Sequence, residues 1–247
     1  MNVCVITDHD FLYQFFKKTV KNDLYRNVNF DFFFSFNNSA FQETYKNNAF
    51  RPICLAEKNK DFFSSYDLFF SLHCNQIFPK ELVENHICIN MHPGYNPYNR
   101  GWFPHVFSML NGMPAGVTIH RMDTKLDHGP ILYQQTVTVE KSDTSYDVYK
   151  KIQELECRML EEFLPAIISG SYTERSVAAE GNINYKKDFQ RLCEIDMERP
   201  ATYGEVISYL RAMTFPGFRN AFFRDEQGNK IFVNIELQRE DPEFLDA

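Results

Sequence analysis

Short apolar runs alternate with amphipathic stretches along the first two thirds of the chain. Runs that predict strands lie at 2–7, 30–34, 53–56, 67–73, 86–90, 116–122 and 130–139. Stretches with helical spacing of apolar residues, which predict helices, lie at 8–20, 79–83, 104–110 and 145–168. Because the strands are apolar throughout and alternate with helices, the pattern predicts an α/β fold, with a mostly parallel sheet covered by helices on both faces.

The pattern changes after about residue 180, so we divide the chain into a domain at 1–180 and an extension at 181–247. The boundary follows Ser169-Gly-Ser171, which ends the long helix. In the extension, 203–213 predicts a helix, and 220–224 with 230–238 predict a β-hairpin. This extension is small for an independent domain, and we expect it to pack on the first domain or on a second subunit.

Net charge and cysteine usage narrow the class of protein. The 247 residues carry a formal net charge of -7 and contain no long Lys/Arg block, so we expect no nucleic-acid partner. Six cysteines occur without a CxxC pair, which indicates free thiols and a reducing compartment. The sequence shows neither a signal-peptide pattern nor an apolar run of about 18 residues. We therefore expect a cytoplasmic protein without a membrane-spanning segment.

Polar side chains stand at the ends of two predicted strands. Asn90 and His92 end the strand before Pro93-Gly94, and Asp127 lies in the turn after the strand at 116–122. In an open α/β sheet, the carboxyl ends of strands are the usual place for a site, so we expect these three residues to converge. Asp123 is the rival carboxylate, and either aspartate alone is compatible with an ordinary turn.

The three side chains suit acyl transfer to an amine. Such a reaction needs a neutral amine, removal of a proton on attack and stabilisation of charge on the carbonyl oxygen. No Ser or Cys stands in a G-x-S-x-G frame, which favours direct attack by the amine over an acyl-enzyme. A zinc site built from His92, His105, His120 and Asp127 is an alternative, but their spacing matches no metal motif, and we expect no metal.

Four motifs give the chain a resemblance to the folate-dependent formyltransferase family. They are Asn90-Met-His92 with Pro93-Gly94, Asn99-Arg-Gly101, the run at 116–123, and Leu126-Asp-His-Gly129. The resemblance is strong over about 67–140. It implies a Rossmann-like domain and 10-formyltetrahydrofolate as co-substrate. The resemblance also implies that His92 takes the amine proton or steadies the oxyanion, that Asn90 holds the formyl oxygen, and that Asp127 orients His92 and relays a proton.

The same resemblance implies where the two substrates bind. By this likeness the pterin lies near six residues, which are Gln76, Ile77, Phe78, Met122, Asp123 and Leu126. Expected contacts to phosphate or sugar are Arg100, Trp102, Tyr185 and Lys186.

The extension, with the runs at 211–218 and 221–223, looks like that of the sugar-nucleotide N-formyltransferases. That likeness implies a homodimer whose extension serves dimerisation and nucleotide contacts. It implies as acceptor a dTDP-4-amino-4,6-dideoxy sugar, foremost dTDP-4-amino-4,6-dideoxyglucose, in O-antigen biosynthesis. Three alternatives remain: another amine (UDP-4-amino-arabinose, methionyl-tRNA or glycinamide ribonucleotide), a non-catalytic sugar-nucleotide binding module, and a metal hydrolase.

Overall fold

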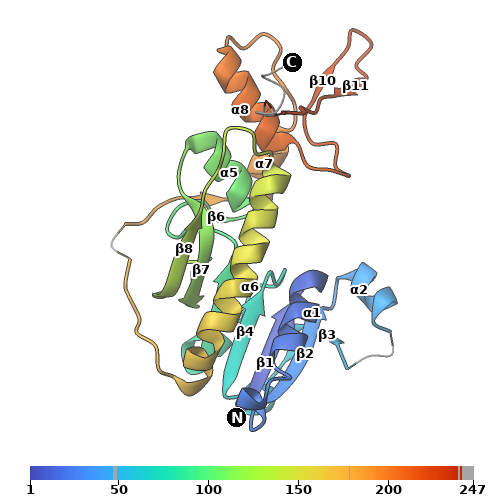
Figure 1. Ribbon diagram of the computed structural model, residues 1–247. Coiled ribbons are helices and arrows are strands. Elements are labelled where there is room, and N and C mark those ends of the chain that lie inside the picture. Colours follow the sequence, from blue (N-terminus) through green and yellow to red (C-terminus); the bar gives the residue numbers. More distant parts are fainter. Residues whose placement is uncertain (47–48, 178, 239, 241–247) are drawn as a thin grey trace.

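A seven-stranded sheet forms the centre of the computed structural model, which describes residues 1–46, 49–177, 179–238 and 240 (Figure 1). Its strands stand in the order β3 (Arg51–Ile53), β2 (Asn29–Ser35), β1 (Asn2–Thr7), β4 (Leu68–Leu72), β5 (Ile87–His92), β7 (Ala115–Arg121) and β8 (Ile131–Val137). The first five strands are parallel, whereas β7 runs antiparallel to both β5 and β8. The α/β fold with a mostly parallel sheet is therefore confirmed.

Helices cover both faces of this sheet. They are α1 (Asp10–Thr19), α2 (Ser39–Thr44), α3 (Lys60–Ser64), α4 (Lys80–Asn85), α5 (Pro104–Asn111) and α6 (Ser145–Ser169). Successive strand residues point to opposite faces, so Val5 packs with Ile152 of α6 in one core cluster, while Cys4 packs with Phe63 and Leu82 in the other. This two-sided burial explains why the strands are apolar throughout.

Helix α6 is the longest element and starts with the predicted cap. The hydroxyl of Thr144 and the carboxylate of Asp147 complete a capping box, in which the Thr144 backbone N–H donates to Asp147 Oδ2 over 3.0 Å. From Val148 onwards its apolar stripe packs against the sheet in one core cluster, and other positions of the helix carry polar groups.

The extension packs on the N-terminal end of α6 and on α5. It contains β9 (Ile183–Asn184), which pairs with β6 (Arg100–Gly101), then α7 (Lys186–Leu192), α8 (Tyr203–Met213), β10 (Phe222–Arg224) and β11 (Lys230–Phe232). Ala212 and Met213 of α8 are fully buried against Val106 of α5. The expected packing on the first domain is thus observed, while the boundary at residue 180 stays a prediction.

Three predicted elements differ from the structure. The strand expected at 53–56 is wrong, because β3 ends at Ile53 and 55–57 forms a 3-10 helix; Pro52 is tolerated because β3 is an edge strand. Strand β5 continues to His92 rather than ending at 90, and β11 stops at Phe232 rather than at 238. None of the helices in the described residues is both long and apolar enough to cross a bilayer.

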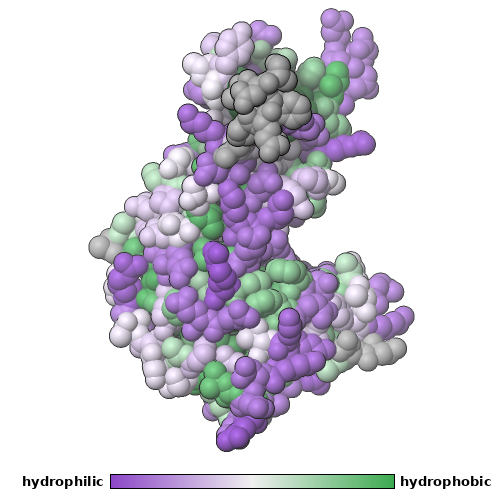
Figure 2. All heavy atoms as spheres, viewed as in Figure 1, coloured by the Kyte–Doolittle hydropathy of each residue, from purple (hydrophilic) through white to green (hydrophobic). Residues whose placement is uncertain are grey.

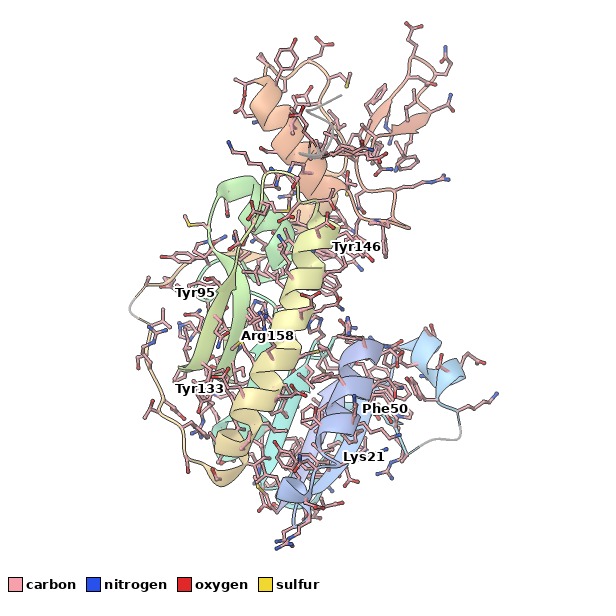
Figure 3. All side chains as sticks on the ribbon, viewed as in Figure 1. Lys21, Phe50, Tyr95, Tyr133, Tyr146 and Arg158 are labelled. Carbon is pink, nitrogen blue, oxygen red and sulfur yellow. The ribbon has the colours of Figure 1, made fainter. Side chains whose placement is uncertain are left out.

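The molecule is hollowed on one side, between the end that carries α5 and α8 and the end that carries α1 and α2 (Figure 2). We call this hollow the notch; α6 runs along it, and Tyr146 on α6 lies beside it (Figure 3). The carboxyl ends of β1 and β4 point towards the notch (Figure 1). The expected location of a site, the carboxyl edge of the sheet, is therefore also the open side of the molecule.

Candidate functional site

The three residues predicted to converge do so. Asn90 and His92 project from the carboxyl end of β5 on the face opposite α6, and Asp127 reaches them from the loop after β7. The Asn90 Nδ2 donates to Asp127 Oδ1 over 3.0 Å, and His92 Nδ1 lies 3.5 Å from Asp127 Oδ2. An amide, an imidazole and a carboxylate therefore share one site, and their catalytic role stays a prediction.

The loop around Asp127 is held from several sides. Asp127 has a φ of 44°, a left-handed conformation that a residue other than glycine rarely adopts. The Gly101 N–H donates to its Oδ2 over 3.1 Å, and the Asn96 side chain donates to its carbonyl over 2.8 Å. Arg100 donates to the carbonyl of Leu126 over 3.4 Å. These contacts fix the carboxylate and compensate for the strained backbone.

His120 is a fourth member of the site, which the sequence suggested only as a ligand in the alternative zinc site. It lies directly across from Asn90 in the β5–β7 pair, with its Nε2 3.3 Å from Asn90 Nδ2 and 3.8 Å from Asp127 Oδ1. Its Nδ1 lies 3.0 Å from the Arg121 carbonyl and so carries the hydrogen, which leaves Nε2 to accept from Asn90. The alternation of polar Thr118 and His120 in an apolar strand was the available signal, but the antiparallel pairing was not visible.

Both imidazoles of the site are held neutral. Burial lowers the pKa of His92, although the charge of Asp127 acts in the opposite direction, and burial lowers the pKa of His120 in the same way. With Nδ1 facing the carboxylate, the neutral His92 ring keeps its hydrogen on Nδ1, and Nε2 carries a free lone pair. The His92 ring is thus set up as a base rather than as a cation.

The free nitrogen of His92 is buried and has no hydrogen-bond partner in the described part of the chain. Gly94 keeps the space above it open, because a Cβ at that position would lie 2.5 Å from His92 Nε2. An unpartnered buried nitrogen under a glycine fits a small polar group, such as a formyl group or an amine, approaching from outside.

The first group of residues predicted to contact a pterin lies in the loop after β4. Phe78 is 5% exposed in the core on the face opposite α6, whereas Ile77 is 87% exposed. The Gln76 side chain braces neighbouring loops, since it donates to the Ile53 carbonyl over 3.0 Å and accepts from the Leu55 N–H over 3.0 Å. Of these three residues, Ile77 is exposed, Gln76 is half-buried and engaged with its neighbours, and Phe78 is buried.

The second group predicted to contact a pterin lies between β7 and β8. Met122 packs against the core cluster that contains Phe78. Asp123 accepts from the Lys125 N–H over 2.8 Å and lies 2.6 Å from His128 Nδ1, while Leu126 is 42% exposed. Asp123 thus stabilises its own turn, and the rival carboxylate does not join Asn90 and His92.

The residues predicted to contact phosphate or sugar lie together around β6 and β9. The Lys186 Nζ stands 5.5 Å from the centre of the Trp102 ring, and Tyr185 is 49% exposed beside it. Arg100 is only 3% exposed, and its guanidinium donates to the Leu126 carbonyl and, over 3.0 Å, to the Glu180 carbonyl. Its guanidinium therefore ties the end of the first domain, just before the extension, to the Asp127 loop.

A pocket of about 250 Å³ opens beside Asp127. It is lined by residues that include Asn96, Arg100, Asp123, Asp127 and His128. Among the described residues, no group of three or more His, Cys, Asp or Glu side chains is arranged to hold a metal ion.

Comparison with known proteins agrees with this geometry. The Formyl transferase profile matches residues 1–164, and the N-formyltransferase dimerization C-terminal domain profile matches 188–239. The dTDP-4-amino-4,6-dideoxyglucose formyltransferase of Mycobacterium tuberculosis is 46% identical over 192 residues, covering 77% of this chain and 82% of that protein.

Two solved structures share the fold. The 4-N formyltransferase of Francisella tularensis has a TM-score of 0.92 and 41% identity, over 97% of this chain and 98% of that one. The N-formyltransferase of Helicobacter canadensis, crystallised with folinic acid and dTDP-3-aminofucose, has a TM-score of 0.67 over 86% of this chain and 80% of that one. At 20% identity, the second likeness concerns the fold alone.

Proposed function

This chain belongs to the formyl transferase family as a sugar N-formyltransferase, and we propose that its acceptor is dTDP-4-amino-4,6-dideoxyglucose. The donor in this proposal is 10-formyltetrahydrofolate, which brings an activated formyl carbon and a nitrogen leaving group. The convergence of Asn90, His92 and Asp127 carries the proposal. The 46% identity to the mycobacterial protein supports the choice of sugar.

His92 acts as the base for the attacking amine. Its neutral ring offers the Nε2 lone pair to the amine hydrogen, and Asp127 stabilises the imidazolium that forms. Both hydrogens of the Asn90 amide are engaged, one with Asp127 and one with His120 over the longer 3.3 Å. When substrate binds, the Asn90 amide can release its hydrogen bond to His120 and donate that hydrogen to the formyl oxygen instead. His120 thus holds this hydrogen only until the substrate oxygen arrives.

Aromatic rings beside the notch suit the nucleobase of the acceptor. Phe215 lies edge-on to Tyr146 at 5.2 Å and to Phe218 at 5.5 Å between ring centres, and Phe218 is 62% exposed. Bases stack on exposed aromatic faces with little sequence preference. In this proposal the nucleotide lies on the side of the notch that carries Phe215 and Phe218, with its sugar directed at the carboxyl edge of the sheet.

The extension also supports a homodimer. Val206 and Ile207 on α8 are 43% and 42% exposed, and Tyr203 is 91% exposed, within the segment that matches the dimerization profile. We expect Ile207→Glu to shift the protein from dimer to monomer in sedimentation, because it places a charge in an apolar contact. An unchanged dimer in Ile207→Glu, with the exposed Gln227→Glu as control, would place the interface elsewhere.

The setting of the reaction is part of the same proposal. All six cysteines are free thiols, which agrees with a reducing cytoplasm. The product of the reaction, a formylated dTDP-sugar, would serve the assembly of lipopolysaccharide O-antigen.

The test is a formyl-transfer assay with 10-formyltetrahydrofolate across a panel of amino-sugar nucleotides. We expect the highest kcat/KM with dTDP-4-amino-4,6-dideoxyglucose. A higher value with UDP-4-amino-arabinose would overturn the acceptor and leave the chemistry intact. Tight sugar-nucleotide binding without any transfer would instead indicate a binding module.

A further inference from the structure

A second polar cluster, half-buried apart from the fully buried Glu156, lies on the other face of the same sheet edge. Tyr149, Gln153 and Glu156 project from one side of α6, at the helical spacing of four and three residues. Tyr149 Oη and Gln153 Nε2 approach His9 Nε2 at 2.8 and 2.9 Å, and Glu156 Oε1 approaches His73 Nε2 at 2.8 Å. No step described above uses this cluster.

The position of His73 places this cluster next to the formyl-transfer site. Strands β4 and β5 pair in parallel with Leu72 beside Met91, so the next residues, His73 and His92, follow side by side at the carboxyl edge. His73 has a φ of 51°, an uncommon left-handed conformation for a histidine, and its ring meets α6 instead of the opposite face. A backbone strained in this way at a sheet edge is typical of a functional position.

The partner of His73 is Glu156, a buried carboxylate with one unpartnered oxygen. Glu156 is fully buried, and its Oε2 has no hydrogen-bond partner in the described part of the chain. Burying a carboxylate with one partner costs free energy of folding, so packing alone gives no reason for it. The His73 side chain, in contrast, is 14% exposed and so connects the carboxylate to the notch.

The chemistry of the proposed reaction calls for a second proton acceptor. An amino sugar arrives at neutral pH as an ammonium ion, and its nitrogen loses two protons before it becomes an amide. One bond forms between nitrogen and the formyl carbon, and the bond from that carbon to the folate nitrogen breaks. The folate nitrogen takes one of the two protons, and the other has to leave through the protein to water.

We propose that the His73–Glu156 pair accepts the first proton, from the bound ammonium group, and passes it to water through the notch. This inference rests on the proposed function and assigns His73 as the group that touches the amine and Glu156 as its positioning partner. His92 then handles the second proton, on the other face, during transfer. One proton is thus accepted on the His73 face of the sheet edge and the other on the His92 face.

The groups that surround His73 fit this division. The titratable groups that face it are His9 from α1, His92 from β5, His105 from α5, and Tyr149 and Glu156 from α6. Burial lowers the pKa of His9 to about 3 and that of His105 to about 4, and burial with the charge of Glu156 raises the pKa of Tyr149. His9, His105 and Tyr149 therefore stay neutral at pH 7 and do not compete for the proton.

The decisive variants are Glu156→Gln, which keeps the shape and removes the charge, and His73→Asn, because asparagine tolerates a left-handed backbone. We would measure kcat/KM for the dTDP-amino sugar from about pH 6 to 9, at saturating 10-formyltetrahydrofolate. We expect both variants to lose on the order of 100-fold near pH 7 and to approach the wild type near pH 9, where solvent supplies neutral amine. The exposed Glu162→Gln on the same helix is the matched control and keeps the wild-type profile.

An equal loss at every pH, or no loss near pH 7, would overturn the role of the pair. Nitrogen-15 spectra of the imidazoles test it without turnover: adding dTDP-4-amino-4,6-dideoxyglucose should protonate His73 in the wild type and not in Glu156→Gln. Protonation on binding in a wild type that transfers no formyl group would refute the proposed function alone. Unchanged His73 signals in an active wild type would refute the proton pair alone.

Discussion

The two polar clusters at the carboxyl edge differ in how their carboxylates are bound. On one face, Asp127 is surrounded by Asn90, His92, His120 and the Gly101 N–H. On the other face, Glu156 has a single hydrogen-bond partner in the described residues, with one oxygen left over. A carboxylate held by several donors is fixed in place and orients the groups around it, whereas Glu156 contacts one imidazole and can position that ring alone.

The largest expected effect distinguishes Asp127 from its neighbour Asp123. Asp127→Asn removes the charge that stabilises protonated His92, and we expect kcat to fall on the order of 10³-fold with the fold retained. Asp123→Asn, four residues earlier, changes a side chain that caps its own turn, and should alter KM for the folate more than kcat. Steady-state kinetics and circular dichroism check both, and equal losses of kcat would show that Asp127 has no special role.

A smaller effect tests access to the free nitrogen of His92. In Gly94→Ala the new methyl group would lie 2.5 Å from His92 Nε2, and we expect kcat/KM to fall about 100-fold. Gly204→Ala, where the backbone is helical and the added Cβ meets only Thr202 Oγ1 at 3.9 Å, controls for the loss of a glycine. Wild-type kinetics in Gly94→Ala would mean that the substrates do not approach from this side.

The smallest expected effect concerns the pH dependence of stability and tests His105, which lies near His73. Burial first, and then the charge of His73, lowers the pKa of His105 from 6.5 to about 4. Between these values the unfolded chain binds a proton that the folded chain excludes. Stability that is complete above pH 6.5 is therefore lost as the pH falls, at about 1.4 kcal/mol per pH unit.

The measurement for this prediction is urea unfolding near pH 7 and pH 5.5. His105→Gln should lose less unfolding free energy than the wild type between the two pH values, because glutamine does not titrate. A loss of the same size in both proteins would contradict the neutral state of His105 in the fold.

The cluster around Asp127 could be predicted from the sequence, whereas the cluster around His73 and Glu156 could not. Asn90 and His92 end an apolar strand at a Pro-Gly stop, a local pattern that shows their position without any tertiary contact. His120 needed the antiparallel β5–β7 register, and Arg100 needed its burial under the extension, neither of which leaves a local trace. The helical period places Glu156 on the buried side of α6, where its sequence position alone indicates no function. Its contact with His73, 83 residues away, can be recognised only in the structure.

The most direct test of the account is His92→Asn. We would follow the transfer of an isotope-labelled formyl group from 10-formyltetrahydrofolate to dTDP-4-amino-4,6-dideoxyglucose, together with calorimetric binding of that sugar nucleotide. We predict that the variant binds the sugar nucleotide as the wild type does but transfers label on the order of 10³-fold more slowly. Transfer at the wild-type rate would show that the imidazole beside Asp127 is not the base of the reaction.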